Sequence, residues 1–196
     1  MYLLLMKDRE ILRRHIDQTI QLNDEQFDYF FSFFKPVSFK KKQSIIQIGD
    51  DVTCEYFVLN GCLKTFFVND EQKMHILQFA TKTWWASDYN ALHNNKKATV
   101  NLDCVSDADT LCLFSEDREK VCKEIHEVET FLRWRSNKGY IGLQKRILSL
   151  LNNDARSRYE ELMQQYPELY NLVPKHLIAA YLGVSRETLS RLYHAR

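Results

Sequence analysis

The sequence predicts an α+β protein with a helical start, a region of short strands, a long helix and two short helices at the carboxyl end. Three observations support this class. Hydrophobic residues alternate between Val37 and Phe114, they recur at helical spacing after Ser115, and Gly183 separates two short helical segments. About seven short strands at roughly 8 to 12-residue spacing indicate a sandwich or barrel rather than a parallel sheet.

The first 36 residues are expected to form two helices, because their apolar residues recur at helical spacing from residue 7 onward. Asn23 and Asp24 offer an N-cap between the two pieces. Pro36 ends the pattern, since proline cannot donate the hydrogen bond that a helix interior requires. We interpret the phenylalanines of the second helix as core residues; they are Phe27, Phe30, Phe31 and Phe34.

The strands of the next region are short, rich in β-branched and aromatic residues, and separated by turn residues. Asn60-Gly61 suits a two-residue hairpin turn, because both residues accept positive φ. The strands are expected at residues 44–48, 55–59, 63–68, 75–79, 98–105 and 110–114.

A second helical region is expected to begin at Ser115 or Glu116 and to continue as one long helix from about residue 127 to 151. A helix of about 25 residues spans nearly 40 Å, which is too long for one small domain to cover. We therefore expect an exposed stripe that pairs with the same helix of a second chain. Two glycines would let the backbones approach, although they could instead mark a hinge between two shorter helices. The proposed dimer contacts are Val128, Leu132, Arg135, Gly139 and Gly142.

After the long helix, Asp154 is expected to cap a helix that runs to about Gln165, and Pro167 closes it. Residues 168–173 are expected to connect to the last two helices through a short wing.

The last two helices are predicted at 175–181 and 186–194, with Gly183 at the corner and Ser185 as the N-cap of the second. Pro174 suits the first position of the first helix. Such a corner with a shared apolar core is the helix-turn-helix motif, whose second helix lies in the DNA major groove. An ordinary helical hairpin with a solvated charged face is the alternative. The residues assigned to the core are Ile178, Ala179, Leu182, Val184, Leu189 and Leu192.

The outward face of the second helix carries groups that can read bases. Arginine can donate two hydrogen bonds to guanine, and glutamate can accept one from cytosine. The candidate DNA-binding residues are Arg186, Glu187, Ser190 and Arg191, together with Ser185 and Lys175.

The charge distribution agrees with a DNA-binding carboxyl end. From Arg133 onward there are eleven Lys/Arg and five Asp/Glu, a net charge of +6. Residues 1–132 have sixteen Lys/Arg and twenty-one Asp/Glu, a net charge of −5. A basic segment of this kind neutralises DNA phosphates.

The chain shows neither a signal peptide nor an apolar run of about 18 residues, so we expect a cytoplasmic protein that does not enter a membrane. The five cysteines are scattered without a CxxC pair, so no metal or other cofactor is expected.

The order of strands, long helix and helix-turn-helix resembles the Crp/Fnr family of bacterial transcription regulators. The resemblance is most specific in Ser185–Arg191 (SRETLSR), and residues 56–64 (YFVLNGCLK) are similar to the family's strand–hairpin–strand signature. It implies a homodimer with three parts. They are a cyclic-nucleotide-binding-like, jelly-roll-like β-roll at 1–114, a linker and dimerisation helix at 115–151, and a winged helix-turn-helix domain at 152–196 that binds a palindromic operator. An activator of this kind also contacts RNA polymerase.

The resemblance also implies an effector pocket, but this sequence departs from the cyclic-AMP-binding members. Those members hold the cyclic phosphate with an arginine, and residues 84–99 contain none. Asp88 is the candidate for the ribose-binding acid and Lys97 for the cation, while Trp84 and Trp85 are interpreted as core residues more readily than as a platform for a ligand. We therefore expect no response to cyclic AMP and leave the effector unknown. The candidate pocket residues are Trp85, Ser87, Asp88, Tyr89, Lys97, Thr99 and Phe131.

Two other functions have less support in the sequence. A cupin-like enzyme or ligand-binding protein would need several histidines on one barrel face, yet only His75 of the six histidines lies in a predicted strand and no HxH pair exists. A sensor whose helix-turn-helix binds a protein is disfavoured by the basic carboxyl end. No catalytic motif is present, so an enzyme is not expected.

Overall fold

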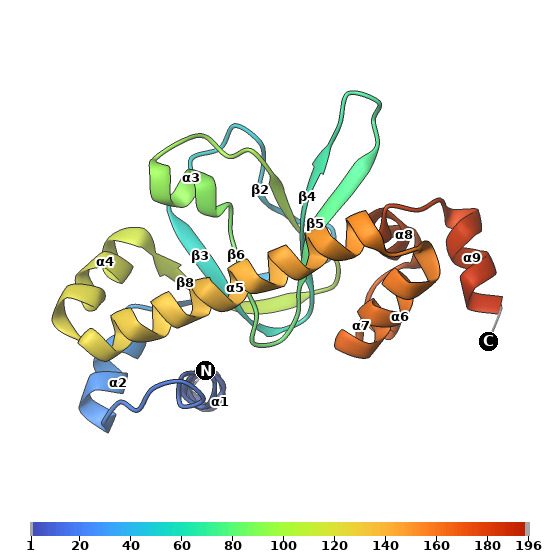
Figure 1. Ribbon diagram of the computed structural model, residues 1–196. Helices are drawn as coiled ribbons and strands as arrows, with labels where there is room; N and C mark the ends of the chain where they lie inside the picture. The colour runs from blue at the N-terminus through green and yellow to red at the C-terminus, as the bar shows by residue number, and fades with distance from the viewer. Residues whose placement is uncertain (1, 195–196) are drawn as a thin grey trace.

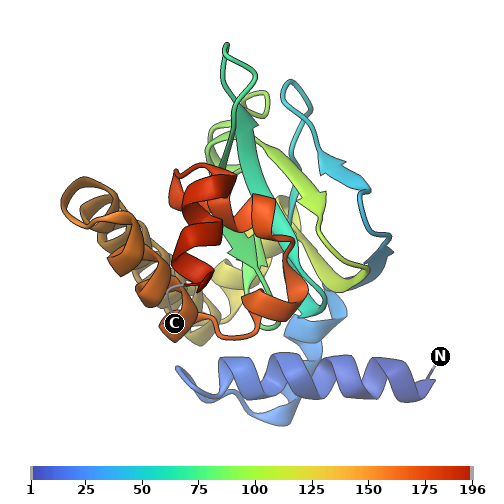
Figure 2. The same ribbon diagram turned by 90° about the vertical axis from the view of Figure 1, so that its right-hand side faces the viewer.

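The computed structural model describes residues 2–194 and begins with two helices packed below a β-roll (Figures 1 and 2). Helix α1 is Tyr2–Ile16 and α2 is Asp24–Ser32. Asn23 caps α2 as expected: its side chain accepts from the Gln26 N–H, and the Gln26 side chain accepts from the Asn23 N–H. Phe27 and Phe30 of α2 are fully buried, which confirms that these two phenylalanines belong to the core.

Two four-stranded antiparallel sheets form the roll. One has the order β1-β8-β3-β6 and the other β2-β7-β4-β5, so strands distant in sequence are paired. The bounds are β1 Lys35–Phe39, β2 Ser44–Ile46, β3 Cys54–Asn60, β4 Leu63–Val68, β5 Met74–Ala80, β6 Trp85–Ala86, β7 Asn101–Cys104 and β8 Ala108–Phe114.

The six expected strands are present, and three further elements were not predicted. Strand β1 contains Pro36 and lies at a sheet edge, where a missing N–H is tolerated. Strand β6 has only two residues and helix α3, Tyr89–Asn94, only six, so neither is long enough to show a period. The two-residue hairpin expected at Asn60-Gly61 is wrong. Gly61 has φ of 86°, but Asn60 ends β3 without positive φ, and β3 and β4 belong to different sheets, so this turn passes the chain from one sheet to the other.

Successive side chains of β3 point to opposite faces of the sheet and pack into two different hydrophobic cores. Val58 packs inside the roll with Leu63 and Ala86, whereas Phe57 and Leu59 point to the opposite side of the sheet and pack with α1, α2 and the first turns of α5. The inside of the roll is filled by side chains such as Phe39 and Leu102.

Helix α4, Ser115–Glu124, leads into α5, His126–Asn152, which crosses the roll diagonally without interruption (Figure 1). The alternative of a hinge at the two glycines is therefore wrong. One face of α5 turns toward its own chain: Val128 and Leu132 are buried in the helix-side core, and Arg135 pairs with Glu55 of β3.

The dimer contacts expected on α5 are corrected by this arrangement. Val128 and Leu132 are 0% and 2% exposed, so they cannot meet a second chain without unpacking the core. Gly139 lies on the same inward face, because it stands about one turn after Arg135. Gly142 follows about one further turn along this face. Both glycines are exposed, so the correction applies to Val128, Leu132 and Arg135, and a dimer contact at the glycines stays a prediction. The exposed apolar residues away from this face are Ile141, Ile147 and Leu151; Tyr140 and Leu148 are exposed too, but they also border the cavity described below.

The C-terminal helices are α6 Ala155–Gln165, α7 Leu169–Leu172, α8 Lys175–Leu182 and α9 Arg186–His194. Asp154 caps α6 through the Ser157 N–H, as expected. The wing expected at 168–173 is wrong, because this segment forms α7 instead. Across residues 2–194, none of the helices combines the length and apolar character that a membrane span requires.

Candidate functional site

Helices α8 and α9 form the predicted corner. Gly183 ends α8 with φ of 69°, and the Ser185 hydroxyl accepts from the Thr188 N–H at 3.1 Å, as an N-cap does. Leu189 of α9 is 1% exposed and packs on buried residues of α8. The apolar positions assigned from sequence therefore form one core; they are Ile178, Ala179, Leu182 and Leu189, with Val184 and Leu192 partly buried beside them.

The candidate base-reading residues share the exposed side of α9. Arg186, Glu187, Ser190 and Arg191 are exposed, and they lie on the first two turns of the helix. The hydrogen bond with Ser185 is the main cause that keeps the pKa of Glu187 below its ordinary value, so this side chain is a carboxylate at neutral pH. At the end of the molecule, α9 projects away from the roll (Figure 1).

Lys175 is the first residue of α8 and is exposed. The rest of α8 is held between α9 and the roll. Leu177 and Ile178 pack with Ile76 and Phe79 of β5, so the corner rests directly on the strand region. Figure 2 shows the C-terminal helices beside β4 and β5.

Arg146 of α5 stabilises the contact between α8 and β5. Its guanidinium donates to the Ile76 carbonyl and the Tyr181 carbonyl, both at 2.8 Å, and lies 3.5 Å from the centre of the Tyr181 ring. Burial lowers the pKa of Arg146, yet a guanidinium remains charged at any physiological pH. One side chain therefore joins the long helix, the strand region and the helix-turn-helix.

The structure brings the residues predicted for an effector pocket together only in part. Asp88 caps α3 by accepting from the Ala91 N–H at 3.0 Å, and it also accepts from the Thr99 N–H and hydroxyl. Burial raises the pKa of Asp88, but these N–H donors outweigh it and lower the pKa overall. The Lys97 ammonium pairs with Asp51 at 2.8 Å. The two charged groups thus have protein partners.

The remaining predicted pocket residues divide between core and cavity. Phe131 is fully buried in the helix-side core, and the Ser87 hydroxyl donates to the Cys54 carbonyl. Trp85 and Tyr89 line a cavity of about 1100 Å³ that follows the inward face of α5. This cavity extends beyond them, toward α6 and α7.

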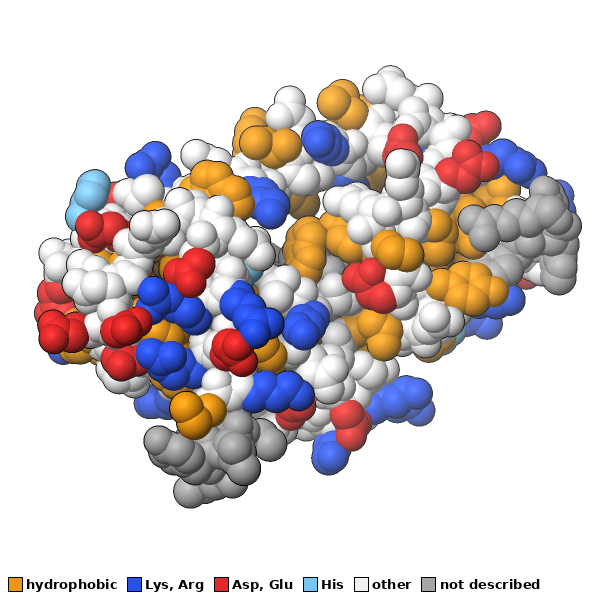
Figure 3. Space-filling view, turned by 90° about the horizontal axis from the view of Figure 1, so that it is seen from below, with side chains coloured by type: hydrophobic (Ala, Val, Ile, Leu, Met, Phe, Trp, Pro, Cys, Tyr) orange, Lys and Arg blue, Asp and Glu red, His pale blue; other side chains and the backbone are white. Residues whose placement is uncertain are grey.

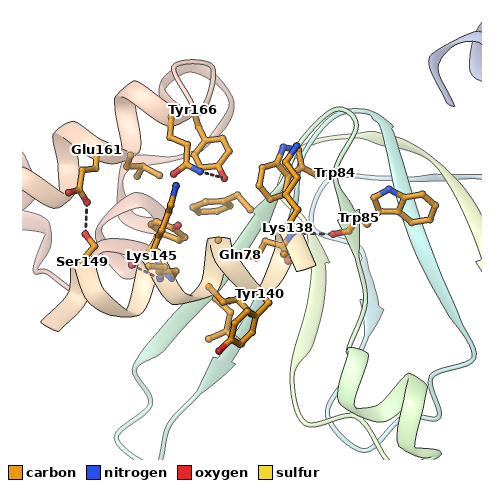
Figure 4. A pocket seen from close by; sticks show the side chains of 18 of the residues that line it. Gln78, Trp84, Trp85, Lys138, Tyr140, Lys145, Ser149, Glu161 and Tyr166 are labelled. Carbon is orange, nitrogen blue, oxygen red and sulfur yellow. Dashed lines mark hydrogen bonds between the residues drawn. The ribbon is translucent and has the colours of Figure 1, made fainter. Parts of the chain in front are cut away.

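We call the C-terminal part of this cavity the α5 cleft. It lies between α5, the side chains of Gln78 and Trp84, and Tyr166 after α6 (Figure 4). Seen from below, apolar side chains follow the upper edge of the molecule and the surface is hollowed beneath them (Figure 3). Sequence reasoning did not identify the cleft, because its residues come from distant segments. The sequence features that could have indicated it are the bulky Trp84 and the glycines of α5, but nothing in the sequence connects them.

A buried ionic cluster near the cavity also escaped prediction. Glu55 is fully buried and pairs with Arg135 at 2.8 Å and with Arg118 of α4 at 3.7 Å. The Arg135 guanidinium lies 4.2 Å from the centre of the Trp85 ring. A charged residue within an apolar strand was the only sequence signal, and its partners are more than 60 residues away.

The structure offers no support for a metal-dependent barrel. Within residues 2–194, His, Cys, Asp and Glu form no group of three that could hold a metal ion. The described cysteines are free thiols, and four of the five are buried.

Comparison with solved structures defines the fold. The chain is similar to FixK2 from Bradyrhizobium japonicum, with a TM-score of 0.72 and 15% identity over 83% of each chain. It is similar to the c-di-GMP-responsive global regulator CLP from Xanthomonas campestris, with a TM-score of 0.69 and 12% identity over 88% of this chain and 91% of that one. No family model and no curated protein matches the sequence significantly.

A transcriptional regulator of the Crp/Fnr family from Eubacterium rectale gives a TM-score of 0.67 with 16% identity, over 89% of this chain and 83% of that one. The molecule is thus an α+β protein with a cyclic-nucleotide-binding-like roll followed by a helical C-terminal part. Its fold is that of the Crp/Fnr regulators.

Proposed function

We propose that this chain is a DNA-binding transcription regulator of the Crp/Fnr type and not an enzyme. The observation that carries the proposal is the α8–α9 corner, which leaves Arg186, Glu187 and Arg191 exposed on the first turns of α9. These side chains have the donors and acceptor needed for base edges in a major groove. The basic balance after Arg133 supports contact with phosphates, and this role implies a cytoplasmic location.

The proposed regulator is a homodimer joined through the outward face of α5. Leu151 is 76% exposed, Ile147 55% and Ile141 49%, an apolar exposure along one helix that a soluble monomer rarely presents. Three parts follow from this assignment: a sensor part at 1–114, a linker and dimerisation helix at 115–151 and a DNA-binding part at 152–196. A twofold axis between the α5 helices would present two α9 helices to one duplex.

The sensor part is proposed not to respond to cyclic AMP. Asp88 and Lys97, which would replace the usual ligand groups, are engaged by Thr99 and Asp51. Titration of the protein with cyclic AMP, followed by calorimetry and by operator affinity, tests this part. Saturable binding that changes operator affinity would contradict it.

Selection of binding sites from randomised duplex DNA by the purified protein tests the main proposal. The expected result is an inverted repeat with half-sites about 34 Å apart and an affinity that falls steeply with salt. Recovery of sequences without a shared motif would overturn it. Transcription with purified RNA polymerase on the selected operator then separates activation from repression.

A further inference from the structure

We propose that the α5 cleft binds a small molecule that carries both a planar aromatic ring and a negatively charged group. The volume of about 1100 Å³ for the whole cavity is slightly above the usual range for small-molecule sites, so a ligand would fill only part of it. Gly139 and Gly142 line it, and a Cβ atom built at either glycine meets no other atom within 4 Å. The bare helix backbone therefore leaves room between α5 and the opposite wall.

The opposite wall is aromatic. Trp84 and Tyr166 are both half-buried, and their ring centres lie 5.3 Å apart in an edge-to-face arrangement. Phe79 and Tyr181 also line the cavity, and their ring centres lie 5.4 Å apart. In Figure 4 Trp84 and Tyr166 lie across the cleft from α5. Rings held in this way offer a stacking surface that tolerates many planar ligands.

The charges in the cleft favour an anion. Lys138 and Lys145 stand seven residues apart, so both leave the same flank of α5, and Lys145 extends toward Tyr166 in Figure 4. Glu161 is the acidic residue among the described lining residues, and it already accepts hydrogen bonds from Ser149 and Asn153. Within the described part of the chain, none of the salt bridges involves Lys145.

The position of the cleft connects a ligand to the C-terminal helices. Gln78 and Trp84 belong to the strand region, whereas Tyr166 and Tyr181 belong to the segment that carries α8 and α9. A ligand between them would contact both and would change how the corner rests on β5. This regulatory consequence rests on the proposed function, but the binding site itself does not.

Isothermal calorimetry on the full chain tests the site with two charged aromatic probes, guanosine monophosphate and 2-naphthoate. Their uncharged counterparts, guanosine and 2-naphthylmethanol, serve as comparisons. The expected result is 1:1 binding of at least one charged probe, at least tenfold tighter than its uncharged counterpart. The probe that binds identifies the source of the aromatic anion as nucleotide or carboxylic acid. Absence of binding by both charged probes would overturn the proposal.

Two variants locate the bound probe. Gly142→Leu fills the cleft from its floor, and Lys145→Gln removes one charge with little change in shape. Each is expected to weaken binding at least tenfold, whereas Lys123→Gln, an exposed lysine on α4, should leave it unchanged. Circular dichroism confirms that Gly142→Leu is folded. Equal affinity in wild type and Lys145→Gln would exclude the cleft as the anion site.

Operator affinity is measured separately, with and without the bound probe. A change in affinity supports the coupling between cleft and corner, and unchanged affinity contradicts it while the site remains. Loss of the operator motif alone would overturn the proposed function without affecting the calorimetric result.

Discussion

Arg146 and Tyr181 form a contact that joins the long helix to the helix-turn-helix: the guanidinium donates to the Tyr181 carbonyl at 2.8 Å and lies 3.5 Å from its ring centre. The same guanidinium also holds the Ile76 carbonyl of β5. The orientation of the C-terminal helices therefore depends on one side chain of α5. This dependence leads to the first prediction.

Arg146→Met should loosen the C-terminal helices. Two partly buried carbonyls lose a charged donor, which is expected to cost about 1–3 kcal/mol of stability. Amide hydrogen exchange should accelerate in α8 while the roll remains protected. Arg156→Met, on the exposed surface of α6, is the control and should change neither quantity. Unaltered exchange in Arg146→Met would show that the apolar contact with β5 is sufficient.

Arg191→Ala should weaken operator binding by about 1–3 kcal/mol and relax the preference for one base pair in each half-site. The reason is the loss of a guanidinium from the exposed face of α9. Competition binding with single-base operator variants measures both effects. Arg133→Ala, a charge change on α5 far from α9, should retain the wild-type base preference. Equal selectivity of Arg191→Ala and wild type would disprove the assigned recognition face.

Leu151→Asp should convert the proposed dimer into a monomer, because it places a charge on the outward face of α5. Leu150→Asp is a matched control. Leu150 is also exposed, at 42% against 76% for Leu151, but it turns toward the flank of the cleft. Sedimentation equilibrium distinguishes the two. Dissociation by both substitutions, or by neither, would contradict the assignment of the outward face.

Glu55→Gln should destabilise the protein by about 3–5 kcal/mol, because removing one partner leaves Arg118 and Arg135 in a buried site without a carboxylate. Urea unfolding followed by tryptophan fluorescence measures the change. Glu116→Gln, at the start of α4, is the control. A loss below about 1 kcal/mol would mean that water replaces the carboxylate.

His15 should make stability fall in acid. Burial, followed by the nearby charges of Lys138 and Arg135, lowers the pKa of His15 to about 4. The unfolded chain, with an ordinary pKa near 6.5, therefore binds the proton first, and stability is lost as pH falls from about 6.5 toward 4. His15→Gln should show a shallower decline in this window by urea unfolding at successive pH values. Parallel curves for the two proteins would refute the assignment.

The C-terminal corner was predictable because its signals are local. Gly183, the Ser185 cap and the apolar residues of both helices lie within some twenty residues, and every contact among them follows from helical spacing. The strands were also visible wherever they were long enough to alternate. Strand β6 and helix α3 were missed because two or six residues do not reveal a period.

The prediction for α5 shows where local signals end. Val128, Leu132 and Arg135 form a regular stripe along α5. Such a stripe can pack either against a second chain or against a sheet of the same chain, and its spacing is the same in both cases. The roll occupies this stripe through Glu55 and the helix-side core. The sequence also shows apolar residues on the other face of α5. They could not be chosen as the dimer contact without knowing which face the roll covers.

By itself, the sequence determined the class of the fold, the positions of most helices and strands, and the helix-turn-helix, because each depends on residues a few positions apart. Only the tertiary structure decided which face of α5 remains exposed, which acid meets Arg135, and that Trp84, Gly142 and Tyr166 surround one cleft. Those relationships join segments tens of residues apart, and periodicity carries no information about which distant surfaces meet.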